Sequence, residues 1–138
     1  MPEADAWAAR LRTGEAMVLL CVARLLVMLA HFGWWRAYVG PAKGARACKD
    51  PAIVRRLAAH IERAAWRLPF AVKCLPQAVA LSWQLRRRSI AHRIVIAVRP
   101  PGARGGEDDL HAWVECGSAI VLGELPGPWA EIHTLGKA

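Results

Sequence analysis

The sequence predicts an α+β fold in which a helical half, residues 1–90, packs on a β-rich half, residues 91–138. In the first half, apolar residues recur at helical spacing behind recognisable helix starts. In the second half, short apolar runs flank a glycine turn, which is typical of strands. With 138 residues, 55% of them hydrophobic, the chain is long enough to bury a core, and we expect one domain, 1–138.

The N-terminal region contains the longest apolar run. A first helix is expected from Glu3 to about Arg12, and Gly14 is expected to end it before an apolar helix from Ala16 to Phe32. That run is about as long as the shortest membrane spans, but Arg24 lies within it, and a charge at a bilayer centre is costly. The sequence therefore favours a buried helix of a globular core.

Aromatic residues follow this apolar run and leave a second interpretation open. Trp34, Trp35 and Tyr38 surround Arg36, and such residues are common where a protein meets a membrane surface. An exposed apolar patch here would equally suit a protein interface. Contact with a membrane surface therefore stays an alternative.

Two further helices are predicted before residue 90. Asp50 is a good N-cap, and Pro51 suits the first position of a helix that continues to about Trp66. Ile53, Leu57 and Ile61 share one stripe of this helix, which is expected to face the core. Cys74 begins the next helix, which runs to about Arg88, and the row Ala78, Leu81 and Leu85 that follows Cys74 is expected to face the core. Arg86, Arg87 and Arg88 complement the negative end of its dipole, and they also offer a docking surface for an acidic partner.

The C-terminal half is predicted to be a sheet. A central strand is expected from Arg93 to Arg99, followed after a glycine-rich loop by a hairpin of His111–Cys116 and Ala119–Leu122. Gly117 and Ser118 form its predicted two-residue turn. Regular pairing from this turn places Glu124 opposite His111, whereas a slip of one residue would put Gly123 there.

Cys74 and His111 are the candidate catalytic residues. A thiol at a helix N-terminus lies in the positive end of the helix dipole, which favours the thiolate, and an imidazole within reach would act as its base. Glu124 is the candidate third member, and Glu115 is a weaker one. The alternatives are a buried structural thiol at position 74 and His92 as the base, although His92 is expected in an exposed loop.

Composition narrows the classes of partner and cofactor. The 19 basic and 11 acidic residues give a net charge of +8, which suits an acidic partner, but no nucleic-acid-binding motif accompanies it. The four cysteines form no CxxC pair, which argues against a structural zinc site. No cofactor is expected. No signal peptide is evident, and we expect a cytoplasmic protein with reduced thiols.

Two motifs in this order resemble a known family. Cys74-Leu75-Pro76-Gln77-Ala78 opens a helix, and His111-Ala112-Trp113-Val114-Glu115 forms a strand downstream. In these motifs, and in the apolar helix before them, the chain resembles the lasso-peptide maturation B proteins, leader peptidases of the transglutaminase-like superfamily. The resemblance covers nearly the whole chain and implies a papain-like or transglutaminase-like core.

The resemblance implies a cysteine peptidase that removes the leader from a ribosomally made lasso precursor. Cys74 would be the nucleophile and His111 the general base. Many family members carry an aspartate after the histidine strand, but here the region reads Val121-Leu122-Gly123-Glu124. The implied partners are the precursor peptide, a separate leader-recognition protein and a lasso cyclase. Another thiol acyl transfer, and a non-catalytic basic peptide-binding or membrane-surface scaffold, are the competing functions.

Overall fold

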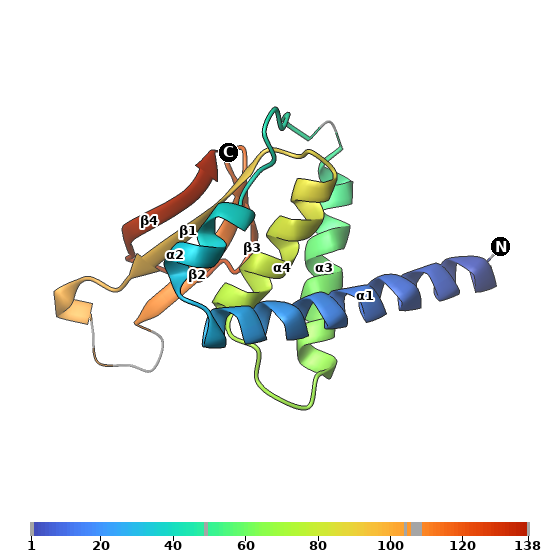
Figure 1. Ribbon diagram of the computed structural model, residues 1–138, viewed down its shortest axis with the longest axis horizontal. Coiled ribbons are helices and arrows are strands. Elements are labelled where there is room, and N and C mark those ends of the chain that lie inside the picture. Colours follow the sequence, from blue (N-terminus) through green and yellow to red (C-terminus); the bar gives the residue numbers. More distant parts are fainter. Residues whose placement is uncertain (1, 49, 104, 106–108, 138) are drawn as a thin grey trace.

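Helices cover one face of a four-stranded antiparallel sheet, which confirms the α+β prediction (Figure 1). The computed structural model describes residues 2–48, 50–103, 105 and 109–137. The helices are α1 (Pro2–Leu29), α2 (Phe32–Trp35), η1 (Arg36–Tyr38), α3 (Pro51–Arg67), α4 (Cys74–Arg87) and η2 (Pro101–Ala103). The strands are β1 (His92–Val98), β2 (Leu110–Cys116), β3 (Ala119–Leu122) and β4 (Ala130–Lys137).

Helix α1 runs unbroken through Gly14, so the predicted break there is wrong. A glycine inside a helix costs about 1 kcal/mol relative to alanine. Here Ala16, Leu20 and Ala23 lie fully buried on one face of α1, which packs against α3 and α4. Burial of this face offsets the cost of Gly14. Arg24, within the apolar run, lies over the ring of Phe70 at 4.3 Å.

Helix α3 begins as the sequence predicts. The side chain of Asp50 accepts a hydrogen bond of 3.0 Å from the backbone N–H of Ala52, and Pro51 occupies the first helical turn. Leu57 and Ile61 are buried on the inward face, as expected. Ile53, predicted on the same stripe, is instead exposed, and Val54 is buried in its place.

The sheet has the strand order β3-β2-β1-β4, with every neighbouring pair antiparallel. Strand β4 was not predicted, because the sequence from Ala130 to Lys137 alternates too weakly to indicate a strand. It pairs with β1 and supplies Leu135 to the core. The fourth strand therefore forms from residues whose local sequence does not predict a strand.

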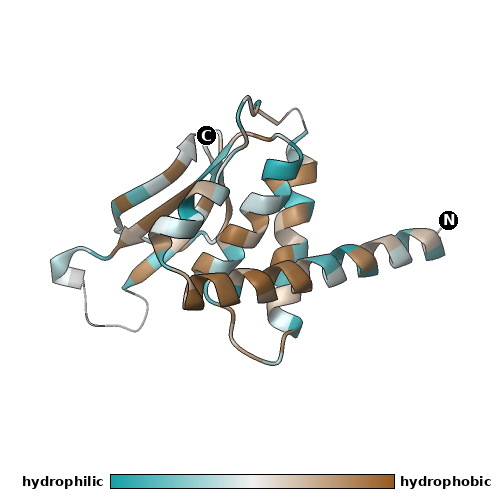
Figure 2. Cartoon of the chain, in the orientation of Figure 1, coloured by the Kyte–Doolittle hydropathy of each residue, from teal (hydrophilic) through white to brown (hydrophobic). Residues whose placement is uncertain are grey.

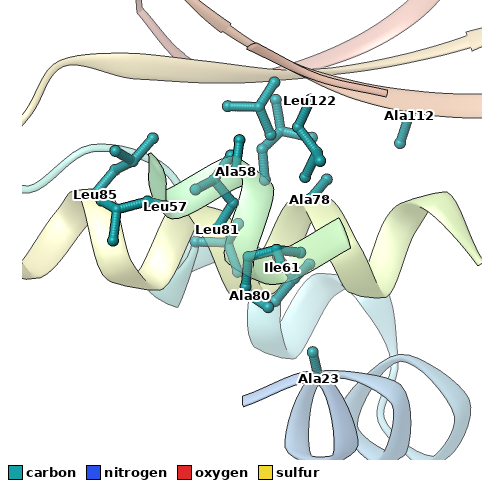
Figure 3. Packing of buried hydrophobic residues seen from close by; sticks show 14 of the residues in the cluster. Ala23, Leu57, Ala58, Ile61, Ala78, Ala80, Leu81, Leu85, Ala112 and Leu122 are labelled. Carbon is teal, nitrogen blue, oxygen red and sulfur yellow. The ribbon is translucent and has the colours of Figure 1, made fainter. Parts of the chain in front are cut away.

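The main core lies between the helices and one face of the sheet (Figure 3). Ala78, Leu81 and Leu85 of α4 are fully buried there, as the sequence predicts for the inward face of this helix. Ala112 and Leu122 meet them from the sheet. The opposite face carries a smaller cluster of Val95, Ala97 and Trp113, packed against Ile120 and Trp129.

Within the described part of the chain, no helix has the length and apolar character required to cross a membrane. Helix α1 buries one face against the core and exposes the other. The expected apolar helix of residues 16–32 thus packs on the core, as the sequence favours, but it ends at Leu29 and a separate helix begins at Phe32.

Candidate functional site

Cys74 is the first residue of α4 and is half-buried at the edge of the main core. The segment before it is held by Gln77, whose side-chain amide donates a 2.9 Å hydrogen bond to the carbonyl of Val72. The first backbone hydrogen bond of the helix runs from Gln77 N–H to Lys73. The N–H groups of Cys74 and Leu75 have no acceptor among the described residues, so they are available to bind an oxyanion.

His111, the second residue of β2, is only 6% exposed. Its Nε2 atom lies 2.5 Å from the carbonyl oxygen of Gly123, which accepts a hydrogen bond from it. Because the carbonyl can only accept, Nε2 carries the proton of the neutral ring, and Nδ1 carries the lone pair. Nδ1 has no hydrogen-bond partner among the described residues, so it is free to take a proton.

Two aromatic rings lie beside the His111 imidazole. The ring of Trp129 stacks on it at 5.4 Å between centroids, and Trp113 lies 6.1 Å away. The guanidinium of Arg99 lies over the ring of Trp129, 4.3 Å from its centroid. Trp129 was missed by sequence reasoning, because it lies in an irregular segment that reaches β2 only through the tertiary fold.

Glu115 is held on the same face by two other partners. One carboxylate oxygen accepts a 2.8 Å hydrogen bond from the indole of Trp113, and the other forms an ion pair with Arg93. Neither interaction involves His111. Glu115 therefore anchors Trp113, and the weaker expectation that it contacts His111 is not met.

The predicted pairing of His111 with Glu124 is wrong. Strands β2 and β3 pair as expected at Cys116–Ala119 and at Glu115–Ile120, but a bulge then shifts the register so that Val114 faces Leu122. The extra residue is Val121, and a bulge of this kind displaces every position beyond it. Glu124 is exposed, and the carbonyl of Gly123 takes the place at Nε2.

The structure brings the elements of Cys74 and His111 together but not their side chains. Helix α4 packs against β2, and both elements begin at the same end of the molecule (Figure 1). Successive residues of a strand point to opposite faces, so Ala112 faces α4 while His111 shares the outer face with Trp113. Among the described residues, no hydrogen bond joins Cys74 to His111.

His92, the alternative base, is not in an exposed loop. It is the first residue of β1 and is completely buried. Its Nδ1 donates a 2.8 Å hydrogen bond to the carbonyl of Ile90, and its Nε2 accepts one of 2.7 Å from the Ser82 hydroxyl. Burial lowers the pKa of His92, and Arg86 lowers it further, against the opposing effect of the Ile90 bond. With both nitrogens engaged, His92 has a structural role.

The other cysteines lie apart from the helix start. Cys116 and Cys48 line one hollow beside the hairpin, and burial raises the pKa of the Cys116 thiol to about 11. A thiol with so high a pKa is a poor nucleophile at neutral pH. Across residues 2–48, 50–103, 105 and 109–137, no group of three or more His, Cys, Asp or Glu side chains is arranged to hold a metal ion.

Comparison with known families agrees with this architecture. Residues 16–136 match the model of the transglutaminase-like superfamily, a span that includes Cys74, His111, the strands β1 to β3 and all of β4 except Lys137. No curated protein and no solved structure matches the chain. Because the match extends over most of the sequence, the chain belongs to the transglutaminase-like superfamily.

Proposed function

We propose that the protein is a cysteine peptidase that removes the leader from a ribosomally synthesised lasso precursor, with Cys74 as nucleophile and His111 as base. The observation that carries the proposal is the state of His111 on the strand against which the Cys74 helix packs. Its Nε2 is tied to Gly123, which leaves Nδ1 as the basic atom. The superfamily includes cysteine peptidases and acyltransferases, and the motifs around both residues resemble those of leader peptidases.

The reaction is acyl transfer through a thioester. Nδ1 of His111 takes the proton of the Cys74 thiol, and the sulfur attacks the carbonyl carbon at the junction of leader and core. The N–H groups of Cys74 and Leu75 donate hydrogen bonds to the oxyanion of the tetrahedral intermediate. The C–N bond then breaks, the imidazolium gives its proton to the leaving amine, and water hydrolyses the thioester.

This reaction requires His111 to move from its place against Trp113. Catalytic hydrogen bonds are often long or unformed in a protein without substrate and tighten when substrate binds. His111 is the second residue of β2, so a rearrangement confined to the start of this strand would be enough to reorient its ring. We propose that binding of the precursor draws Nδ1 toward Cys74.

The partners follow from the same proposal. The precursor peptide is the substrate, a separate protein recognises its leader, and a lasso cyclase receives the cleaved core. An acidic leader would be attracted to Arg86, Arg87 and Arg88, although Arg87 already pairs with Glu15. We place this chemistry in the cytoplasm, where the four free cysteines would stay reduced.

Cleavage of a precursor peptide tests the proposal. The protein, its leader-recognition partner and a precursor from the same gene neighbourhood are mixed, and the products are identified by mass spectrometry. We expect release of the leader with water added at one peptide bond, and complete loss of this activity in Cys74→Ala. His111→Ala should lower the rate by about 100-fold or more, the usual contribution of a general base.

Cys48→Ala is the matched control, since it removes another half-buried thiol outside α4. It should cleave at the wild-type rate. Full cleavage by folded Cys74→Ala would overturn the peptidase proposal. Transfer of the acyl group to an added amine in preference to water would instead identify the competing acyltransferase function.

A further inference from the structure

An apolar strip on α1 lies outside both the core and the catalytic proposal. Val18, Val22, Leu25 and Leu29 are spaced four, three and four residues apart, so they share one side of the helix. All four are exposed, and Leu29 is 80% exposed. In Figure 2 the C-terminal half of α1 is coloured as hydrophobic along its visible side. The strip therefore presents a row of aliphatic side chains to the surroundings.

Aromatic residues of α2 and η1 extend this strip. Trp34 is 75% exposed, and Tyr38 is exposed as well. Val22 of α1 lines one shallow apolar hollow together with Trp34 and Tyr38. The strip and these aromatic side chains thus form one continuous surface, which we call the α1–α2 surface. Contiguous exposed apolar surface of this kind marks an interaction site.

The segment of chain that carries most of the α1–α2 surface has charge of one sign only. Residues 16–48 contain four Lys or Arg and no Asp or Glu. Arg36 lies between Trp34 and Tyr38, and both Arg36 and Lys43 are exposed. Since the whole chain carries +8, a second copy would be repelled, whereas a surface of negative charge would be attracted.

We propose that the α1–α2 surface docks on an anionic lipid bilayer. Interfacial helices lie in the membrane plane with aliphatic and aromatic side chains among the acyl chains, and basic residues pair with anionic headgroups. Trp and Tyr beside Arg are typical of this boundary. The opposite side of α1 stays packed on the core, so the helix lies on the bilayer and does not enter it. The inference does not depend on the proposed peptidase activity.

Vesicle flotation tests this docking. The full chain is mixed with vesicles of phosphatidylcholine containing about one-third phosphatidylglycerol, and with vesicles of phosphatidylcholine alone. We expect flotation with the anionic vesicles, much weaker flotation with the neutral ones, and loss of binding at about 1 M salt, where charges are screened within about 3 Å.

The triple variant Leu25→Gln/Leu29→Gln/Trp34→Gln should lower the partition coefficient by about tenfold or more, because it removes three apolar side chains that the bilayer would bury. All three are exposed, so circular dichroism should show an unchanged fold. Ile53→Gln is the matched control: Ile53 is also exposed and apolar, but it lies in the first turn of α3 and does not line the hollow of Trp34. It should float like the wild type.

Two results would overturn the proposal. One is equal flotation of the wild type and the folded triple variant, which would place lipid binding elsewhere. The other is absence of wild-type flotation together with a dimer in light scattering that the triple variant abolishes. That result would make the α1–α2 surface an interface between copies of this chain.

Discussion

The two faces of the sheet each hold a histidine near the start of a strand, and the two rings are in different states. His92, on the face covered by helices, is fully buried and has a partner at each nitrogen. His111, on the outer face, has a partner only at Nε2. In each ring, a hydrogen bond to a backbone carbonyl fixes which nitrogen carries the proton. The other nitrogen has a partner in His92 but none among the described residues in His111, so only His111 can act as a base.

His92 is constrained by a hydrogen-bond network on the face of the sheet that the helices cover, which we call the helix-side network. The Ser82 hydroxyl donates to His92 and at the same time accepts a 2.8 Å hydrogen bond from the N–H of Gly40. Through this hydroxyl, one side chain ties the segment after η1 to α4 and β1. Among the described residues no such bridge reaches His111, whose ring lies beside Trp113 and Trp129.

Ser82→Ala should break the helix-side network and give the largest effect. It leaves the Gly40 N–H and Nε2 of His92 buried without partners, which should lower the free energy of unfolding by about 2–3 kcal/mol. Urea denaturation measures the loss. Ser118→Ala, in the exposed hairpin turn, is the control and should change it by about 0.5 kcal/mol or less. Equal values for the two variants would mean that the hydroxyl does not hold His92.

Gly123→Ala should disturb the outer face. The residue has a φ of +85°, and an added Cβ would lie 2.9 Å from the carbonyl oxygen of Ala112. Either the Ala112 backbone or the Gly123 backbone, whose carbonyl binds His111, must therefore shift. We expect a loss of about 1–3 kcal/mol and a changed NMR signal for the His111 Nε2 proton.

Gly117→Ala, in the turn between β2 and β3, is the control that separates the effect of steric crowding at Gly123 from that of backbone strain. Gly117 also has a positive φ, but open space surrounds it, so strain alone should cost about 1–2 kcal/mol. The His111 signal should stay as in the wild type. The same signal change in both variants would show that Gly123 has no particular hold on His111.

Acidic pH should destabilise the protein through the buried histidines. Burial lowers the pKa of His92 in the folded protein, and burial with Arg63 and Arg12 nearby lowers that of His60. Below the ordinary value of 6.5, the unfolded chain therefore binds protons that the folded protein does not, and the free energy of unfolding falls as pH falls.

Urea denaturation at about pH 7.5 and about pH 5.5 measures this dependence. His60→Gln removes one contributor, so the dependence that persists in this variant belongs chiefly to His92. If the free energy of unfolding of His60→Gln does not depend on pH, the effect belongs to His60 alone and His92 contributes nothing to it.

Glu124→Gln should have the smallest effect. The side chain is exposed and lies outside the pairing with β2, so stability should change by about 0.5 kcal/mol or less. Cleavage of the precursor peptide should proceed at the wild-type rate, whereas His111→Ala should slow it. Equal slowing in the two variants would restore Glu124 as the residue that orients His111.

Local chemistry explains which elements the sequence could predict. The Asp50-Pro51 start of α3, the inward row of α4 and the turn at Gly117 depend on residues within a few positions of each other. These were predicted correctly because capping, helical periodicity and turn preference act over that range. The break at Gly14 failed because packing of α1 against two other helices outweighs a local preference.

The candidate site depends on contacts between segments that are distant in the sequence, which local sequence patterns cannot predict. A single bulged residue, Val121, moved Glu124 away from His111 and brought the Gly123 carbonyl to Nε2. Trp129 reached the same ring from an irregular segment. No local signal distinguishes a regular hairpin from one with an extra residue, because both bury the same kinds of side chain.

The sequence by itself determined the α+β class, the helix that begins at Cys74 and the strand that carries His111, because periodicity and capping are written in neighbouring residues. Only the tertiary structure decided the partners of each histidine. It buried His92 beneath α4, left Nδ1 of His111 open and kept one side of α1 uncovered. These outcomes depend on which distant segments share a face of the sheet, and packing of the whole chain sets that arrangement.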